Sequence, residues 1–147
     1  MGEATESSDA SATYFPDEVA VALCIYGADL DPAEISQLLG VSPTHAHKRG
    51  ERKAPRSPPW NKGAWIREVR CFEPINPDSM FEQLLSDLPA EAEVWKQLAS
   101  RFQLRVDFAV HTDVGCTFVL APATVKLIAA RLAEFQIYIQ AYGDNDA

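Results

Sequence analysis

Residues 18–26, with the sequence EVAVALCIY, are apolar on both faces of an extended chain. One face carries Val19, Val21, Leu23 and Ile25. Side chains that alternate with a period of two are typical of a β-strand. A strand that is apolar on both faces is usually buried inside a sheet, with neighbouring strands on either side. We therefore expect the fold to be built around a sheet with this strand near its centre.

A helix is predicted directly after this strand. Gly27 ends the strand, and Asp31 and Pro32 then supply a capping side chain and a proline at the first helical position. Glu34 lies three residues after the cap, and Gly40 is well placed to end the helix. The sequence therefore predicts a short helix over residues 32–39.

Residues 65–72 and 104–111 are predicted as two further strands. The first carries Arg67, Glu68 and Arg70, which indicates a position near solvent or at a sheet edge. The second alternates apolar and polar residues most regularly, as expected for a strand with one buried face. Between them, proline-started segments predict a bent pair of helices, one from residue 77 and one after residue 89.

The last third of the chain is predicted to hold a hairpin, a helix and a final strand. Residues 112–115 have turn chemistry, so residues 116–120 are expected to return as a strand against residues 104–111. Pro122 opens a helix, and residues 136–142 form the last strand. The fold class that results is α+β, a mainly antiparallel sheet with helices packed on one face. Two similar strand, helix and strand segments suggest either a duplicated βαβ plan, as in ferredoxin-like sandwiches, or a chance similarity.

The chain has the length of one domain. Of its 147 residues, 47% are hydrophobic and 23% are charged, as in ordinary folded proteins. Residues 14–142 are predicted to form a single domain between a disordered tail, residues 1–13, and an acidic tail, residues 143–147. No apolar run is long enough to span a bilayer and no secretory signal is evident, so we expect a cytoplasmic protein. Three widely spaced cysteines indicate reduced thiols and neither a disulfide framework nor a zinc site.

Charge is distributed unevenly along the sequence. The formal net charge is −8, yet residues 45–62 contain six lysine or arginine residues and only one acid, Glu51. The sequence therefore indicates an acidic body that carries one basic, proline-rich loop. Such an arrangement can orient a charged partner or fold back on the protein's own acidic surface.

No enzyme motif of high specificity is present. The chain lacks a glycine-rich phosphate loop, a G-x-S-x-G elbow, an H-E-x-x-H helix and an EF-hand pattern. Cys24 and Cys71 lie in apolar strand patterns, where a thiolate is disfavoured. We therefore expect a protein that is not an enzyme and that needs no cofactor.

The basic loop supplies the candidate binding residues. His45 and His47 would point the same way in an extended segment, as two metal ligands do, but no third ligand follows from spacing, so we favour a basic surface over a metal site. Cations beside tryptophans also suit nucleic acid, which an acidic body would repel within a Debye length of about 8 Å. The candidate set is His45, His47, Lys48, Arg49, Arg52, Trp60 and Trp65.

Several short motifs resemble those of a known bacterial family. They are Leu30-Asp31-Pro32-Ala33-Glu34-Ile35, Leu38-Leu39-Gly40, Pro43-Thr44, Lys48-Arg49-Gly50 and Trp65. In this order they resemble the domain-of-unknown-function 4279 family, over nearly the whole chain. The resemblance implies no established activity and transfers no catalytic residue. It does imply a small bacterial protein, a profile that suits an immunity protein.

Two functional hypotheses emerge from the sequence. The first is a non-catalytic protein-binding module, in particular a bacterial immunity protein that occludes a cognate toxin with a basic surface. The second is a small-ligand or anion sensor that uses the basic loop, residues 45–62, with Trp65 as a wall. Neither hypothesis fixes the oligomeric state.

Overall fold

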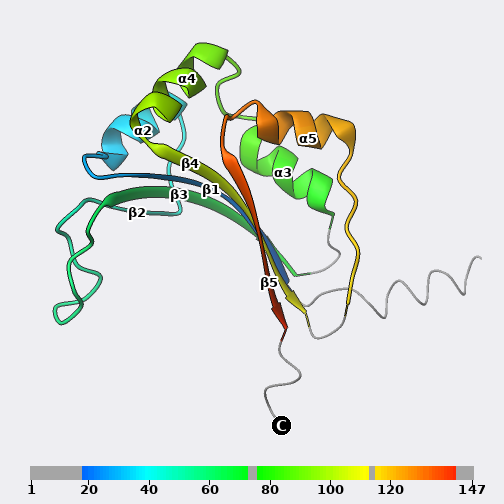
Figure 1. The fold of residues 1–147 in the computed structure, drawn as a ribbon, viewed down its shortest axis with the longest axis horizontal. Coiled ribbons are helices and arrows are strands. Elements are labelled where there is room, and N and C mark those ends of the chain that lie inside the picture. Colours follow the sequence, from blue (N-terminus) through cyan, green and yellow to red (C-terminus); the bar gives the residue numbers. More distant parts are fainter. Residues whose placement is uncertain (1–17, 73–75, 113–114, 142–147) are drawn as a thin grey trace, which may run out of the picture.

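A computed structural model of the chain describes residues 18–72, 76–112 and 115–141. These residues form one five-stranded sheet and four helices (Figure 1). In chain order the elements are β1 (Glu18–Gly27), α2 (Pro32–Leu39), β2 (His45–His47), β3 (Gly63–Cys71), α3 (Pro77–Leu85), α4 (Ala92–Arg101), β4 (Gln103–Thr112), α5 (Pro122–Ala129) and β5 (Glu134–Ala141). The predicted tails, residues 1–13 and 143–147, lie outside the described residues.

The strand that we predicted at residues 18–26 is β1, and it lies at the centre of the sheet as expected. The sheet has the order β2-β3-β1-β4-β5, and β1 pairs antiparallel with both β3 and β4. Opposite Val21 lie Val69 on one side and Phe108 on the other, so apolar side chains of three strands form rows on one face. The other face of β1 carries small residues, including Ala20 and Ala22, which neighbouring side chains bury.

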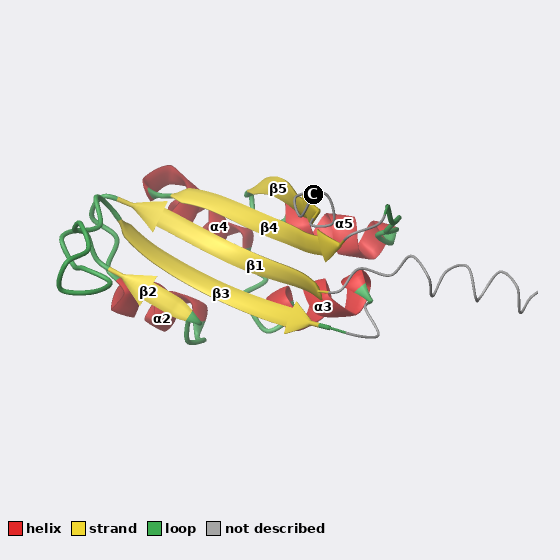
Figure 2. Cartoon of the chain, turned by 90° about the horizontal axis from the view of Figure 1, so that it is seen from below, coloured by secondary structure: helices red, strands yellow, loops and turns green. Residues whose placement is uncertain are grey.

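All four helices cover the same face of the sheet, and the opposite face has no helix among the described residues (Figures 1 and 2). The core lies between the sheet and the helices. Its largest fully buried side chains are Trp65, Trp95, Phe81, Leu23, Ile25, Ile35, Leu84, Leu85 and Leu98. The predicted α+β class, a mainly antiparallel sheet with helices on one face, is therefore confirmed.

Capping side chains start two helices, and the first of these caps, Asp31, is the predicted one. The side chain of Asp31 accepts a hydrogen bond from the backbone N–H of Ala33 at 3.2 Å, and Gly40 ends α2 with φ of 77°. Asn76 caps α3 in the same way: its side-chain oxygen Oδ1 accepts a hydrogen bond from the backbone N–H of Ser79 at 3.2 Å. Local sequence signals thus set these helix boundaries.

The helix α5 is capped from another helix. Its N-cap residue, Ala121, has no capping side chain of its own. Asp78 of α3 supplies the acceptor: its Oδ1 receives hydrogen bonds from the Thr124 hydroxyl at 2.7 Å and from the Ala121 N–H at 3.0 Å. These two hydrogen bonds lower the pKa of Asp78 below its ordinary value, and the bond from the Thr124 hydroxyl has the larger effect.

Replacing Asp78 by alanine is expected to destabilise the fold at neutral pH, with a smaller loss in acid. A carboxylate whose pKa is lower in the folded state adds stability above its unfolded pKa of about 4, and that stability disappears as the pH falls through the folded pKa. Urea unfolding of both proteins at several pH values measures the difference. Glu82→Ala on the same helix is the matched control, and an equal loss for the two variants would contradict the capping role.

Two details of the predicted topology are wrong. Residues 116–120 form no strand, and the neighbours of β4 are β1 and β5 instead of a hairpin partner. The ring of Phe118 packs on the ring of Phe108, with 5.2 Å between their centroids. This segment therefore contacts the core through a side chain and forms no backbone ladder with β4. The duplicated plan also fails, because β1 and β3 are antiparallel whereas β4 and β5 are parallel, joined through α5.

The strand predicted to lie at an edge, β3, has a neighbour on both sides for only part of its length. The three-residue strand β2 pairs with residues 64–66. Beyond Ile66, β3 pairs with β1 alone among the described residues. Its charged half, which includes Glu68 and Arg70, therefore forms the exposed edge that those residues indicated.

Candidate functional site

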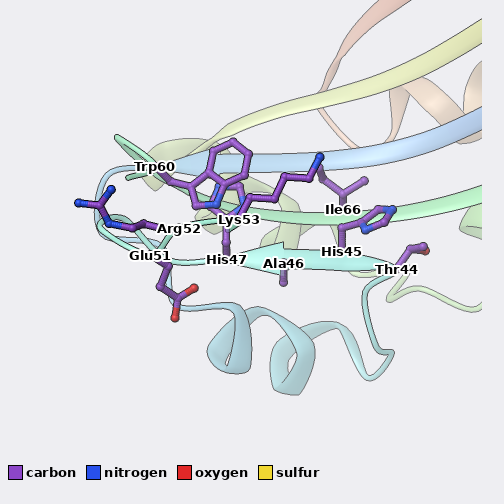
Figure 3. A pocket seen from close by; sticks show the side chains of 9 residues that line it. All are labelled: Thr44, His45, Ala46, His47, Glu51, Arg52, Lys53, Trp60 and Ile66. Carbon is purple, nitrogen blue, oxygen red and sulfur yellow. The ribbon is translucent and has the colours of Figure 1, made fainter. Parts of the chain in front are cut away.

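A cavity of about 620 Å³ opens on the face of β2 and β3 that no described helix covers (Figure 3). Its floor is formed by β2 and the first part of β3, and its wall by the flap, which we define as residues 48–62. The lining residues, drawn in Figure 3, are Thr44, His45, Ala46, His47, Glu51, Arg52, Lys53, Trp60 and Ile66. We call this cavity the flap pocket.

The flap folds back on itself through backbone hydrogen bonds. The N–H of Gly50 donates to the carbonyl of Trp60 at 2.8 Å, and the N–H of Trp60 donates to the carbonyl of Glu51 at 2.8 Å. Gly50 has φ of 92°, a conformation that favours glycine, so the chain can turn sharply there. The long irregular excursion predicted for this region is thus a structured loop that returns Trp60 to the strand β2.

An aromatic stack joins the flap to the sheet. The rings of His47 and Trp60 lie 4.0 Å apart between centroids with an angle of 10° between their planes. His45 and His47 point to the same face of β2, as expected for alternate residues of an extended segment. Trp60 remains 39% exposed, so part of its ring is available to a ligand.

Three of the six cations of the flap differ in their contacts. Lys48 and Arg49 lie outside the pocket lining and approach acids next to α2, with Nζ of Lys48 3.8 Å from Asp31 and Nη2 of Arg49 3.5 Å from Asp29. Arg52 lines the pocket and donates to the carbonyl of Ser57 at 2.6 Å. Lys48 and Arg49 are thus directed toward the body of the protein, and Arg52 toward the pocket lining.

The one acidic residue of the pocket has a local partner. An oxygen of the Glu51 carboxylate accepts a hydrogen bond from the backbone N–H of Lys48 at 2.8 Å. Lys53 extends over the sheet toward Ile66 and His45, whereas the guanidinium of Arg52 lies at the other end of the lining, near the outer part of the flap (Figure 3). The positive charge of the pocket therefore exceeds its negative charge, and anions are the ligands that such a site attracts.

Of the seven residues selected from the sequence, the structure brings His45, His47, Arg52 and Trp60 to the pocket and leaves three outside it. Trp65 is fully buried on the helix-covered face, where its indole N–H donates to the hydroxyl of Ser36 at 3.0 Å. It is a core residue and forms no wall of the pocket. Lys53 and Glu51 line the pocket but were not selected, although both lie in the basic loop.

A second polar cluster lies beside the pocket on the same face. Neighbouring strands place His45, Ile66, Cys24 and Arg105 in one row across the sheet. Arg105 binds the carboxylate of Asp107 through two hydrogen bonds, at 2.7 and 3.2 Å. Only the strand order brings these residues together, so no local sequence signal could have shown the cluster.

The Cys24 thiol of this cluster and the neighbouring Tyr26 phenol are held in their neutral forms. Burial raises the pKa of the Cys24 thiol to about 11, and burial also raises the pKa of Tyr26 to about 12. The guanidinium of Arg105 approaches the Tyr26 hydroxyl at 3.2 Å and is itself paired with Asp107. At neutral pH the cluster offers neither a thiolate nor a phenolate nucleophile.

Within residues 18–72, 76–112 and 115–141, no group of three or more histidine, cysteine or acidic side chains could hold a metal ion. None of the helices in these ranges is long and apolar enough to cross a membrane.

The described residues are electrically balanced. All 13 basic residues of the chain lie in them, together with 13 of its 21 acidic residues. The net charge of −8 therefore comes from the ranges that the structure does not describe, residues 1–17, 73–75, 113–114 and 142–147. The sequence indicated an acidic body, but in the described part the negative charge outside the flap only balances the positive charge of the flap.

Comparison with known families agrees with the motifs noted in the sequence. A family model described as "Domain of unknown function (DUF4279)" matches residues 17–142. The chain, an α+β protein with one sheet and helices on a single face, belongs to this family. No curated protein and no solved structure matches it.

Proposed function

We propose that the protein is a non-catalytic binding protein whose flap pocket takes up a small anion with an apolar or planar part. The observation that carries this proposal is the lining of the pocket. Arg52 and Lys53 line a pocket whose floor includes the side chain of Ile66, beside the partly exposed ring of Trp60. Cations beside an apolar, aromatic surface suit a ligand that has both a phosphate or carboxylate and a flat or apolar body.

The charge pairs of the flap support an anionic ligand. Among the described residues, the flap cations paired with carboxylates are Lys48 and Arg49, outside the lining. The carboxylate of Glu51 is directed to a backbone N–H. Arg52 and Lys53 are thus left to balance the charge of a ligand.

Trp60 offers a direct signal of binding. Trp65 and Trp95 are fully buried, whereas Trp60 is 39% exposed at the pocket. Titration with pyrophosphate, a nucleoside monophosphate and an aromatic carboxylate is expected to change the tryptophan fluorescence with at least one of them. Trp60→Phe should abolish that change and leave the buried tryptophans intact, and unchanged fluorescence with all three probes would contradict the proposal.

Charge substitutions within the flap show whether an anion binds in the pocket itself or is attracted by the overall charge of the flap. Lys53→Gln removes a cation that lines the pocket, and Arg56→Gln removes a cation of the same flap that does not. A ligand that prefers the native state raises the unfolding temperature. We expect the ligand-dependent rise to fall for Lys53→Gln and to persist for Arg56→Gln. Equal losses would show that only the overall charge of the flap attracts the anion.

The protein-binding hypothesis is a second candidate, and the net charge of −8 supports it. An excess of acids speeds the encounter with a basic protein such as a toxin. We keep a bacterial, cytoplasmic immunity protein as this alternative proposal. Size-exclusion chromatography of the chain with the product of a neighbouring toxin-like gene tests it. A stoichiometric complex that neutralises the toxin supports the alternative, and separate elution would remove it.

A further inference from the structure

The strand β5 is the most exposed apolar element of the described protein. It lies at one end of the sheet, with β4 on its inner side and no strand on its outer side among the described residues (Figures 1 and 2). Ile137, Tyr138 and Ile139 are 58%, 50% and 65% exposed. An edge strand of this kind presents unpaired backbone N–H and C=O groups beside apolar side chains, which favours pairing with another strand.

The opposite edge of the sheet differs from β5, because it is protected against pairing with another strand. There β2 has only three residues, and the charged half of β3 follows. Arg70 forms ion pairs with Glu68 and Glu18, and Arg67 pairs with Asp87 at 3.0 Å. Short strands and charged side chains are the usual protection of a sheet edge. From Phe135 to Gln140, β5 has no charged residue and no proline.

We propose that β5 pairs antiparallel with β5 of a second copy of this chain. The pattern of the strand is complementary to itself when the twofold axis passes through Ile137. Phe135 then lies opposite Ile139 of the other copy, and Ile137 lies opposite its own equivalent. These three residues share the face of the sheet that carries the core, because they pair with Val106, Phe108 and Val110 of β4.

The geometry of antiparallel pairing limits the possible registers. Opposite residues of an antiparallel pair point to the same face, so this register keeps the helices of both copies on one side of a continuous ten-stranded sheet. A slip by one residue would place Ile137 opposite Tyr138, whose backbone N–H and C=O groups point to the other edge of the strand, so the possible registers differ by an even number of residues. Among these, the register centred on Ile137 pairs Phe135, Ile137 and Ile139 only with one another.

Charge also favours a second copy as the occupant. The strand has one charged residue, Glu134, and the proposed register places it opposite Gln140 of the other copy. Like charges directly opposite each other would destabilise the pair, and this register has none. The flap pocket lies beyond β3 at the other end of the sheet, so the dimer does not depend on the proposed ligand.

The oligomeric state of the full chain tests the proposal. Sedimentation velocity at increasing concentrations is expected to show a dimer. Ile137→Lys places two ammonium groups at the twofold axis and should give a monomer with an unchanged circular dichroism spectrum. Val119→Lys is the matched control, because Val119 is 77% exposed and lies outside β5, and it should remain a dimer. A monomeric wild-type chain, or a dimeric Ile137→Lys variant, would overturn the proposal.

Cysteine cross-linking tests the register. Ile137→Cys should form an intermolecular disulfide under mild oxidation, because the two introduced thiols meet at the axis. Ile139→Cys should not, since its two copies would lie about 13 Å apart along the strands, beyond disulfide reach. The wild-type chain, which contains Cys24, Cys71 and Cys116, gives the background. Equal cross-linking of the two variants would overturn the register.

A segment of the same chain is the rival occupant of this edge. If the wild-type chain were a monomer and deletion of residues 1–13 produced the dimer, the tail would occupy β5 and the proposal would be overturned. A dimer that forms equally with and without these residues would support the second copy.

Discussion

Phe81→Ala is expected to lower the free energy of unfolding by about 3–5 kcal/mol. The side chain is fully buried in α3, and its ring meets those of Phe108 and Phe135 edge to face, with centroids 5.7 and 6.0 Å away. Its removal would leave a cavity between α3 and the strands β4 and β5. Because these strands are fixed by backbone pairing, the surrounding core can close that cavity only in part.

Urea denaturation measures this loss. Phe72→Ala is the control, because Phe72 is 63% exposed and its removal should change the stability by about 0.5 kcal/mol or less. Similar losses for the two variants would mean that Phe81 does not occupy the centre of the core.

Gly63→Ala is expected to destabilise the protein by about 1–3 kcal/mol and to weaken ligand binding at the flap pocket. A Cβ atom at this position would lie 2.7 Å from the carbonyl oxygen of Leu30 and 3.1 Å from its Cβ. The clash involves backbone, so no side-chain rotation relieves it. Gly63 is the first residue of β3 after the flap, and a shift there would move Trp60 away from His47.

The control for this variant is Gly115→Ala, since nothing lies within 4 Å of a Cβ at Gly115. Thermal unfolding gives the stability of both variants, and titration of the Trp60 fluorescence with the anionic probes gives their binding. A Gly63→Ala protein that is as stable as the wild type, with the same fluorescence change, would show that the strand end tolerates the added methyl group.

The sequence predicted most elements because their signals are local. The alternation in residues 18–26 and 104–111 and the caps at Asp31 and Asn76 each depend on a few consecutive residues, and the structure retains all of them. The pairing of strands depends on residues far apart. The parallel partner of β4 is β5, which follows α5, whereas a turn at residues 112–115 favoured an antiparallel hairpin.

The candidate site could be predicted in part for the same reason. The basic composition of residues 45–62 is visible in the sequence, and four of the selected residues line the pocket. The path of the flap decides which of its cations line the pocket. It brings Lys48 to Asp31 and Arg49 to Asp29, outside the lining. Trp65, the other tryptophan of the candidate set, is a core residue, because strand parity turns it toward Ser36 and the core.

The uneven distribution of acids along the chain has a consequence for handling the protein in solution. Most of the negative excess is contributed by Glu3, Glu6, Asp9, Asp17, Asp144 and Asp146, which precede β1 or follow β5. Proteins near zero net charge lose the mutual repulsion that keeps them dispersed. A protease that trimmed both ends would therefore bring the isoelectric point close to neutrality and leave the apolar strand β5 in a far less soluble particle.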